Sequence, residues 1–270
     1  MFDEKITLSR RGFLGTGAAA LGGLGIAALS GCAPKTLSDT GAADEGAAEA
    51  DAAAADWLGE APVIAEDDIV ETVDVDVLCV GASNGGLVAA ARLAELGSRV
   101  MVAEVLQVPG TFRTSIAAID SRLQKSMDIH VSKAHFAREL QRYMTGQADG
   151  RVIRAWADQS GAAMDWLLDL FEEYGIDYYM ETDHGSEDMA YEEWIITHRI
   201  NDAAGAMEAL VDRAQKNGAD IRYETKMVKL ETDDSGAVVG AICEDLANGG
   251  YIRVKTGKGV VLATGGFATN

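Results

Sequence analysis

A turn of small residues and a later acid are the part of this sequence best suited to hold a charged ligand. Residues 81–86 read GASNGG and follow the apolar run 75–80, which has the length and β-branched content of a buried strand. Glu104 follows Gly81 by 23 positions. That spacing is near the roughly 20 at which an acid holds a ribose hydroxyl in dinucleotide-binding motifs.

The elements around this turn supply the setting that such a motif requires. An Ala- and Leu-rich helix is predicted over 87–96 with Gly97 as its stop, and a second strand over 99–103. In that arrangement backbone N–H groups and the positive end of the helix face a diphosphate. Ser83 stands where the motif has its middle glycine, and a serine hydroxyl can donate to a phosphate. An ordinary strand–helix–strand crossover is the alternative.

A second glycine turn closes the sequence. The apolar strand that begins at 259 runs into Thr264-Gly265-Gly266. Glycines at the end of a buried strand allow a large ligand to approach the backbone closely. A plain strand–loop junction is equally compatible with this pattern alone.

The N-terminus carries features of an export signal. Residues 9–14 read SRRGFL, an apolar stretch follows, and residues 29–32 resemble a lipobox ending on Cys32. We expect a twin-arginine lipoprotein signal over 1–32, lipidated at Cys32, and therefore export to the cell surface or periplasmic side. Two charges before an N-terminal anchor helix are the alternative. Residues 33–70 are expected to be an acidic Ala-rich tether, or else an acidic helix, before a domain over 71–270.

Composition narrows the class of ligand. The net charge of −20 disfavours nucleic acid and an anionic lipid surface, so membrane contact is expected only through the lipid anchor. The 48% hydrophobic content suffices for one core. Cys79 and Cys243 are expected to be buried apolar residues, and no metal site is expected from the cysteine and histidine spacing.

The remaining sequence alternates between helical and strand patterns. A loop or small β excursion is expected over 176–199. Helices are predicted over 133–145, 151–174 and 203–217, and strands over 220–225, 227–232, 237–244 and 251–255, before the strand that begins at 259.

The order of these features resembles the FAD-binding half of the fumarate reductase/succinate dehydrogenase flavoprotein family. The resemblance covers about residues 60–270, is most specific in the segment ATGGF at 263–267, and points to the exported bacterial type that reduces fumarate or urocanate. It implies an α/β fold: a Rossmann-like FAD-binding domain of the GR2 type with a central parallel sheet, a β-meander and a helical insertion. Relatives continue into a capping domain, so the chain is expected to be the incomplete N-terminal part, with that domain absent.

The resemblance also implies a set of FAD contacts. The first turn would face the diphosphate, Glu104 would hold the adenosine ribose, and the backbone at Met227-Val228 would meet the adenine. The segment 110–115 would cradle the phosphates and ribityl chain, although it departs from the usual Gly-Gly-Asn-Ser. The cofactor-binding residues expected on this basis are Gly81, Ser83, Asn84, Gly85, Gly86, Glu104, Thr111, Thr114, Ser115, Met227, Val228, Ala263, Thr264 and Gly265.

The function implied is that of an FAD-dependent oxidoreductase. It would reduce an activated C=C bond of a small organic acid by hydride transfer from flavin, with electrons from an external donor such as a cytochrome or flavin carrier. No residue matches the family's catalytic His and Arg motifs, so none is assigned. A truncated or split-gene fragment that at most binds FAD, and an NAD-dependent dehydrogenase, are the alternatives.

Overall fold

The computed structural model describes residues 62–182 and 194–266. These all belong to a unit that spans Ala61–Asn270, separate from Met1–Glu60. The expected signal over 1–32, with Cys32, and most of the expected tether lie outside the described residues. Within the described residues, no helix has both the length and the apolar character required to cross a bilayer.

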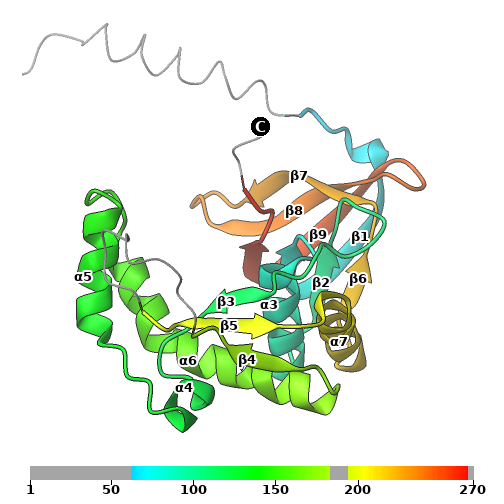
Figure 1. The fold of residues 1–270 in the computed structure, drawn as a ribbon. Helices are drawn as coiled ribbons and strands as arrows, with labels where there is room; N and C mark the ends of the chain where they lie inside the picture. Colours follow the sequence, from blue (N-terminus) through cyan, green and yellow to red (C-terminus); the bar gives the residue numbers. More distant parts are fainter. Residues whose placement is uncertain (1–61, 183–193, 267–270) are drawn as a thin grey trace, which may run out of the picture. The chain divides into compact units, whose positions relative to one another are not determined.

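A six-stranded sheet forms the centre of this unit (Figure 1). Its first four strands run parallel, and its last three make an antiparallel meander that shares the fourth strand. In spatial order the strands are β6 (Asp220–Arg222), β2 (Val100–Ala103), β1 (Ile69–Val80), β9 (Tyr251–Leu262), β8 (Val238–Asp245) and β7 (Thr225–Thr232).

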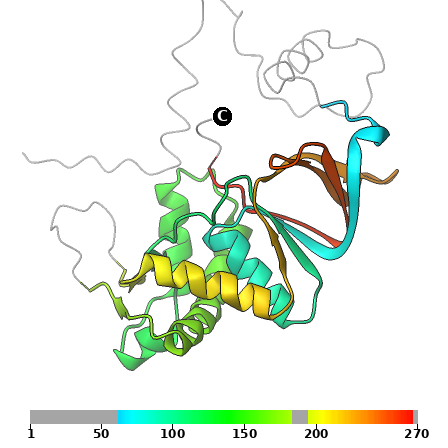
Figure 2. The same ribbon diagram turned by 90° about the vertical axis from the view of Figure 1, so that its right-hand side faces the viewer.

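Helices cover one face of the parallel strands. The helices α3 (Asn84–Glu95) and α7 (Ala203–Lys216) lie side by side, and α6 (Gly150–Glu173) packs into the same apolar core (Figure 2). The other face of β1 and β2 packs against side chains of the meander. The central strands are therefore buried on both faces, which explains why their sequences read as continuous apolar runs.

The two described cysteines belong to different faces of this sheet. Cys79 packs in the helix-side core and Cys243 in the meander-side core, and both are fully buried free thiols. Burial raises the pKa of Cys79 to about 11 and that of Cys243 to about 12. They act as small apolar residues, as predicted.

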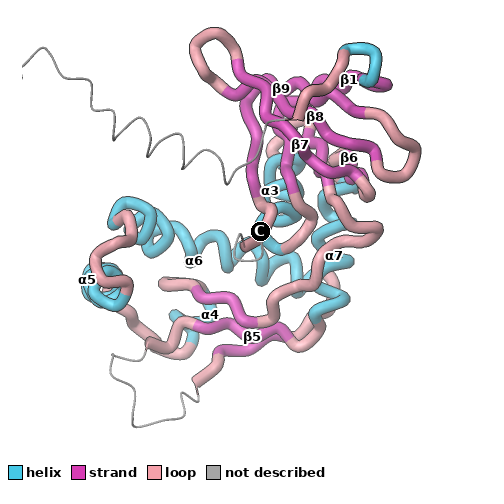
Figure 3. Tube along the Cα trace, turned by 90° about the horizontal axis from the view of Figure 1, so that it is seen from above, coloured by secondary structure: helices cyan, strands magenta, loops and turns pink. Residues whose placement is uncertain are grey.

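The helical insertion carries a second, smaller sheet. It comprises α4 (Arg122–Ser126), α5 (Lys133–Tyr143), α6 and three antiparallel strands in the order β3 (Ser115–Ala117), β5 (Thr197–Ile200) and β4 (Tyr178–Met180). Figure 3 shows α6 and α7 between β5 and the main sheet. The β excursion predicted within 176–199 is present, but its partner β3 was not predicted.

A partly buried carboxylate joins the three long helices. Glu95 at the end of α3 accepts hydrogen bonds from Trp166 of α6 at 2.8 Å and from Arg213 of α7 at 2.7 Å. Burial raises the pKa of Glu95, but hydrogen bonds from Arg213, Arg92 and Trp166 outweigh it, so the net pKa lies below the usual value. This charge network fixes the helix layer behind the first turn.

Several predicted boundaries move. The helix α3 begins at Asn84 rather than 87. The strand predicted over 220–225 ends at Arg222 as β6, and Thr225 is the first residue of β7. The strands predicted over 251–255 and from 259 are one strand, β9, whose glycines lie beside a register shift between Val75 and Val77. β1 begins at Ile69 after a 3-10 helix at Glu66–Asp68, both inside the range 33–70 expected to be a tether.

The predicted fold class is confirmed. The unit is an α/β Rossmann-like domain with a mainly parallel sheet, a β-meander and a helical insertion. In this fold the carboxyl ends of β1, β2 and β9 meet at one edge of the sheet, which is where such domains bind their ligands.

Candidate cofactor-binding site

The two glycine turns are neighbours at the carboxyl edge of the sheet. β1 and β9 are adjacent parallel strands, and the N–H of Ala263 donates to the carbonyl of Val80 at 2.8 Å. Gly81 adopts φ of 101°, and a Cβ added there would lie 2.4 Å from the carbonyl oxygen of Ala263. Only glycine fits this position, because both the conformation and the close backbone approach exclude a side chain.

The third glycine of the motif brings α3 against β1. A Cβ on Gly86 would lie 1.8 Å from the carbonyl oxygen of Gly81, closer than any side chain can approach. A Cβ on Gly85 would have no neighbour nearer than 3.9 Å. Gly86 is therefore required for the helix to begin directly behind the turn, whereas Gly85 is not.

The first turn of α3 is left without a side-chain cap. Ser83 is its N-cap residue, yet its hydroxyl makes no cap hydrogen bond. In the described α4, α5, α6 and α7 the cap side chain does accept from the helix backbone, through the residues Ser121, Ser132, Asp149 and Asp202. The free N–H groups and positive end of α3 thus remain available to an anion.

Glu104 is an acid held inside this site. Glu104 directly follows β2 in the sequence, and the residue is 6% exposed. One carboxylate oxygen accepts the N–H of Ala82 at 2.5 Å and the other that of Leu106 at 3.0 Å. A carboxylate has about four acceptor positions, so capacity remains for hydroxyl groups of a ligand. The charge of Glu104 also adds to the effect of burial in raising the pKa of Tyr223.

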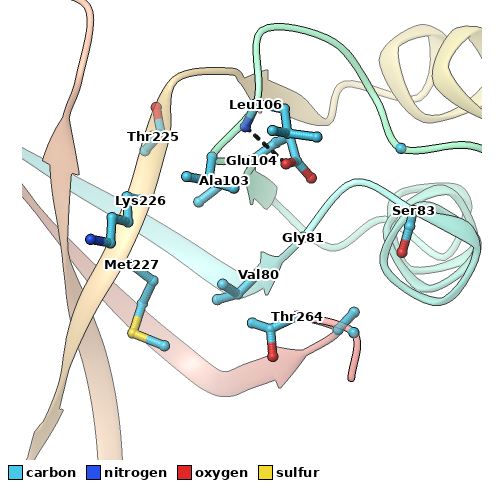
Figure 4. A pocket seen from close by; sticks show the side chains of 14 residues that line it. Val80, Gly81, Ser83, Ala103, Glu104, Leu106, Thr225, Lys226, Met227 and Thr264 are labelled. Atoms are coloured by element: carbon cyan, nitrogen blue, oxygen red, sulfur yellow. Dashed lines mark hydrogen bonds between the residues drawn. The ribbon is translucent and has the colours of Figure 1, made fainter. Parts of the chain in front are cut away.

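These parts enclose one pocket of about 430 Å³ (Figure 4). Figure 4 places Val80, Met227 and Thr264 around the same opening, with Glu104 and Ser83 at its other sides. The lining comes from the ends of β1, β2 and β9, from the loop after β2 and from the start of β7. Its residues are Val80, Gly81, Ser83, Ala103, Glu104, Val105, Leu106, Gly110, Thr225, Lys226, Met227, Ala263, Thr264 and Gly265.

The structure brings half of the expected contact residues together. Seven of them line the pocket, namely Gly81, Ser83, Glu104, Met227, Ala263, Thr264 and Gly265. Seven others do not, namely Asn84, Gly85, Gly86, Thr111, Thr114, Ser115 and Val228. Of these, Gly86 shapes the turn, Ser115 takes a hydrogen bond from Arg199, and Asn84 bonds to the backbone of Arg113.

The remaining lining residues were not predicted from sequence. Val105 and Leu106 follow the acid directly, and Thr225 and Lys226 precede Met227. The sequence signal that could have found these residues is that each lies close in sequence to a predicted contact. A loop that passes over a pocket exposes consecutive residues to that pocket. Among the described residues no cluster of three or more His, Cys, Asp or Glu is placed to hold a metal ion.

Comparison with known proteins identifies the family of this chain. Residues 76–269 match the family described as FAD binding domain. The chain belongs to this family. The matched range takes in both glycine turns, Glu104 and the meander, and FAD is the cofactor.

Three reductases are among the similar curated proteins. A vinyl phenol reductase of Lactiplantibacillus plantarum is 30% identical over 72% of this chain and 38% of its own length. A fumarate reductase (cytochrome) of Shewanella frigidimarina is 28% identical over 79% and 37%. A urocanate reductase of Eggerthella lenta is 29% identical over 74% and 33%. The chain thus spans between a third and two fifths of these relatives' length.

Solved structures agree on the fold. The open conformation of a flavocytochrome c3 fumarate reductase superposes with a TM-score of 0.58 at 25% identity, covering 88% of this chain and 39% of that one. A 3-ketosteroid-delta4-(5alpha)-dehydrogenase of Rhodococcus jostii superposes with a TM-score of 0.61 at 24% identity, covering 77% and 49%. The second likeness supports the α/β fold alone.

The residues of the pocket fit the nucleotide half of FAD. Gly81 and Gly86 leave the backbone open where a Cβ would block it, and α3 directs unbonded N–H groups to the same place. Glu104 presents carboxylate acceptors of the kind that ribose hydroxyls require, and Val105, Leu106 and Met227 form an apolar wall. Anion donors, a hydroxyl acceptor and an apolar wall are the three kinds of contact that an adenosine diphosphate group requires.

Proposed function

We propose that this chain is the FAD-binding part of a reductase that transfers a hydride to an activated C=C bond of a small organic acid. The observation that carries the proposal is the shared pocket of the two glycine turns with Glu104 between them. Similarity to proteins named fumarate, urocanate and vinyl phenol reductase supports the reaction class.

The chain's own residues bind and orient the cofactor in this proposal. The first turn of α3 and the turn at 263–265 hold the diphosphate, and Glu104 holds the ribose. The apolar side chains of Leu106 and Met227 contact the adenine. FAD itself supplies the hydride chemistry when bound, and the protein supplies position and electrostatics.

Electrons would reach the flavin from a separate donor such as a cytochrome or another flavin carrier. Similarity to two proteins named fumarate reductase (cytochrome) supports this choice. No described residue is assigned to the substrate, and assays with fumarate, urocanate and their analogues identify the acid that is reduced.

A chain that binds FAD without catalysing a reaction alone is the second candidate. It is favoured because the described residues form a cofactor pocket and none of them is assigned to the substrate. Binding of FAD together with reduction of fumarate or urocanate by an artificial donor would support the first candidate, and binding alone the second. The NAD-dependent dehydrogenase is not retained, because the chain belongs to an FAD-binding family.

The binding claim is tested by titrating the purified full chain with FAD and following flavin fluorescence. We expect about one FAD per chain for the wild type. The Glu104→Gln variant replaces one acceptor with a donor that faces a backbone N–H, so its affinity should fall by about tenfold or more, since hydrogen bonds to charged groups contribute about 1.5–3 kcal/mol. Glu208→Gln, at an exposed helix position, is the matched control and should bind like the wild type.

Two results would contradict this prediction. One is a wild-type chain that takes up no FAD at any concentration tested. The other is a Glu104→Gln variant whose affinity equals that of the Glu208→Gln control, because the pocket would then not be the binding site.

We further propose that the chain is exported by the twin-arginine route and anchored by a lipid at Cys32. The proposal is supported by the sequence over 9–14 and 29–32, and both segments lie outside the described residues. A pathway that carries folded proteins suits a cofactor that is bound before export.

Cell fractionation tests export. Replacing Arg10 and Arg11 by lysine keeps both charges and should retain the chain in the cytoplasm. Cys32→Ser should be exported but leave the membrane fraction. Arg92→Lys, in the folded unit, controls for lysine substitution as such. Unchanged fractionation of the lysine variant would contradict the route, and a membrane-bound Cys32→Ser chain would contradict the lipid anchor.

A further inference from the structure

The segment 110–114 is fixed to the start of α3 by contacts outside the glycine motif. The N–H of Gly110 donates to the carbonyl of Ala82 at 2.9 Å. A Cβ on Gly110 would lie 3.0 Å from the Cβ of Ser83, so the two loops are in close contact here. Gly110 lines the cofactor pocket, and the position of this segment therefore shapes one of the pocket's walls.

Asn84 makes the next contact. It is the first residue of α3, and its side-chain oxygen accepts the N–H of Arg113 at 2.9 Å. Its side-chain nitrogen lies 3.4 Å from the carbonyl oxygen of the same residue. The amide of Asn84 thus pairs with the peptide of Arg113 in the manner of a strand partner, although 29 residues separate the two. Asn84 itself does not line the pocket.

The rest of the segment is held by packing of Phe112 on α6 and by a backbone hydrogen bond at Thr114. Phe112 is buried and meets Phe171 of α6 edge to face, with ring centroids 5.8 Å apart. The carbonyl of Thr114 accepts the N–H of Ile200 at 2.9 Å. Thr111 and Arg113, on either side of Phe112, are exposed. The segment is therefore held at both ends and through Phe112, with Asn84 as its polar attachment to α3.

We propose that Asn84 is a positioning residue that holds segment 110–114 in the conformation needed at the cofactor pocket. A segment ordered before binding loses less conformational freedom when the ligand arrives, and affinity rises accordingly. The residue works through the backbone of Arg113 rather than by touching FAD. This inference rests on the proposed FAD site, but its first consequence concerns the protein without cofactor.

Hydrogen exchange of the full chain without FAD tests that consequence. In Asn84→Ala the amide of Arg113 loses its acceptor, so peptides covering 111–114 should exchange faster than in the wild type. Asn84→Asp keeps the acceptor and should restore the wild-type rate. Asn201→Ala is the matched control, because Asn201 is exposed and its side chain takes no part in the hydrogen bonds of the described residues.

The second consequence is measured by FAD titration of the same proteins. Asn84→Ala should weaken binding about threefold to tenfold, which is the range expected for loss of one ordinary hydrogen bond. Asn201→Ala should bind like the wild type. Circular dichroism confirms that each variant is folded, and alanine is well tolerated at a first helical position.

Each outcome decides the proposal. Unchanged exchange over 111–114 in Asn84→Ala would overturn it, and so would faster exchange with unchanged FAD affinity, since the contact would then serve only local order. Failure of Asn84→Asp to restore protection would also overturn it. A wild-type chain that binds no FAD would instead reject the proposed function, and the exchange results would show separately whether Asn84 holds the segment.

Discussion

At the scale of single residues, the glycine motif divides into positions that the backbone requires and positions that it does not. Gly81 and Gly86 stand where any side chain would meet backbone oxygen, whereas a Cβ on Gly85 would make only an ordinary contact with Ala263 at 3.9 Å. Ser83, in the place of the usual middle glycine, is the N-cap residue of α3 and lines the pocket, and its hydroxyl makes no cap hydrogen bond. The sequence motif is therefore obeyed where geometry enforces it.

Substitution of the two adjacent helix glycines tests this distinction. Gly86→Ala should destabilise the fold by about 1–3 kcal/mol or more, because overpacking forces α3 away from the turn. Gly85→Ala should be neutral or slightly stabilising, since alanine favours a helix over glycine. Thermal unfolding of both variants provides the measurement. Equal melting temperatures for the two would contradict the close approach at Gly86.

At the scale of secondary structure, a buried serine–histidine contact joins α4 to the small sheet. His198 lies on the central strand β5, is fully buried, and its Nε2 lies 2.7 Å from the hydroxyl of Ser121, the N-cap of α4. Burial lowers the pKa of His198, and the opposing effects of two backbone carbonyls and of Asp165 are smaller. The folded state thus favours neutral histidine.

The sign of the pH effect follows. The unfolded chain takes up a proton at His198 near its ordinary value of about 6.5 while the folded chain does not, so stability is lost as pH falls below that value. Urea unfolding between pH 7.5 and 5.5 should show decreasing stability for the wild type and a smaller decrease for His198→Gln. His130→Gln, at an exposed position, should follow the wild type. A slope unchanged by His198→Gln would reject this role.

Most elements of the fold were predictable because their patterns are local. The strand–turn–helix–strand unit, the long helices and the meander each follow from apolar spacing and from glycine or aspartate at turns. β9 was predicted as two strands because glycine weakens a strand pattern, and only its neighbour β1 shows that the glycines accompany a bulge. β3 is three residues long and exists through pairing with β5, which no local pattern reveals.

The parts of the site that have local sequence motifs were predictable as well. The glycine turns and Glu104 carry their own sequence signal, and the structure places them around one pocket. The contacts of 111–115 were assigned by resemblance, and there the structure shows segment 110–114 attached to α3 by Asn84 and Ser115 hydrogen-bonded to Arg199. These are tertiary contacts between segments far apart in sequence, so neither spacing nor composition could indicate them.

At the scale of the whole molecule, the fold brings distant segments to one edge of a sheet. Strand order β2-β1-β9 places residues 80–86, 104–106 and 263–265 together, although nearly 160 positions separate the second segment from the third. The chain spans 33–38% of the three curated reductases compared above, and its described residues form the pocket at this edge.

The crystal structure of the full chain with FAD tests the central claim most directly. We predict the diphosphate between the first turn of α3 and residues 263–265, with a Glu104 carboxylate oxygen within hydrogen-bond distance of the adenosine ribose. A diphosphate bound at any other place on the chain, or a ribose out of reach of Glu104, would contradict the account.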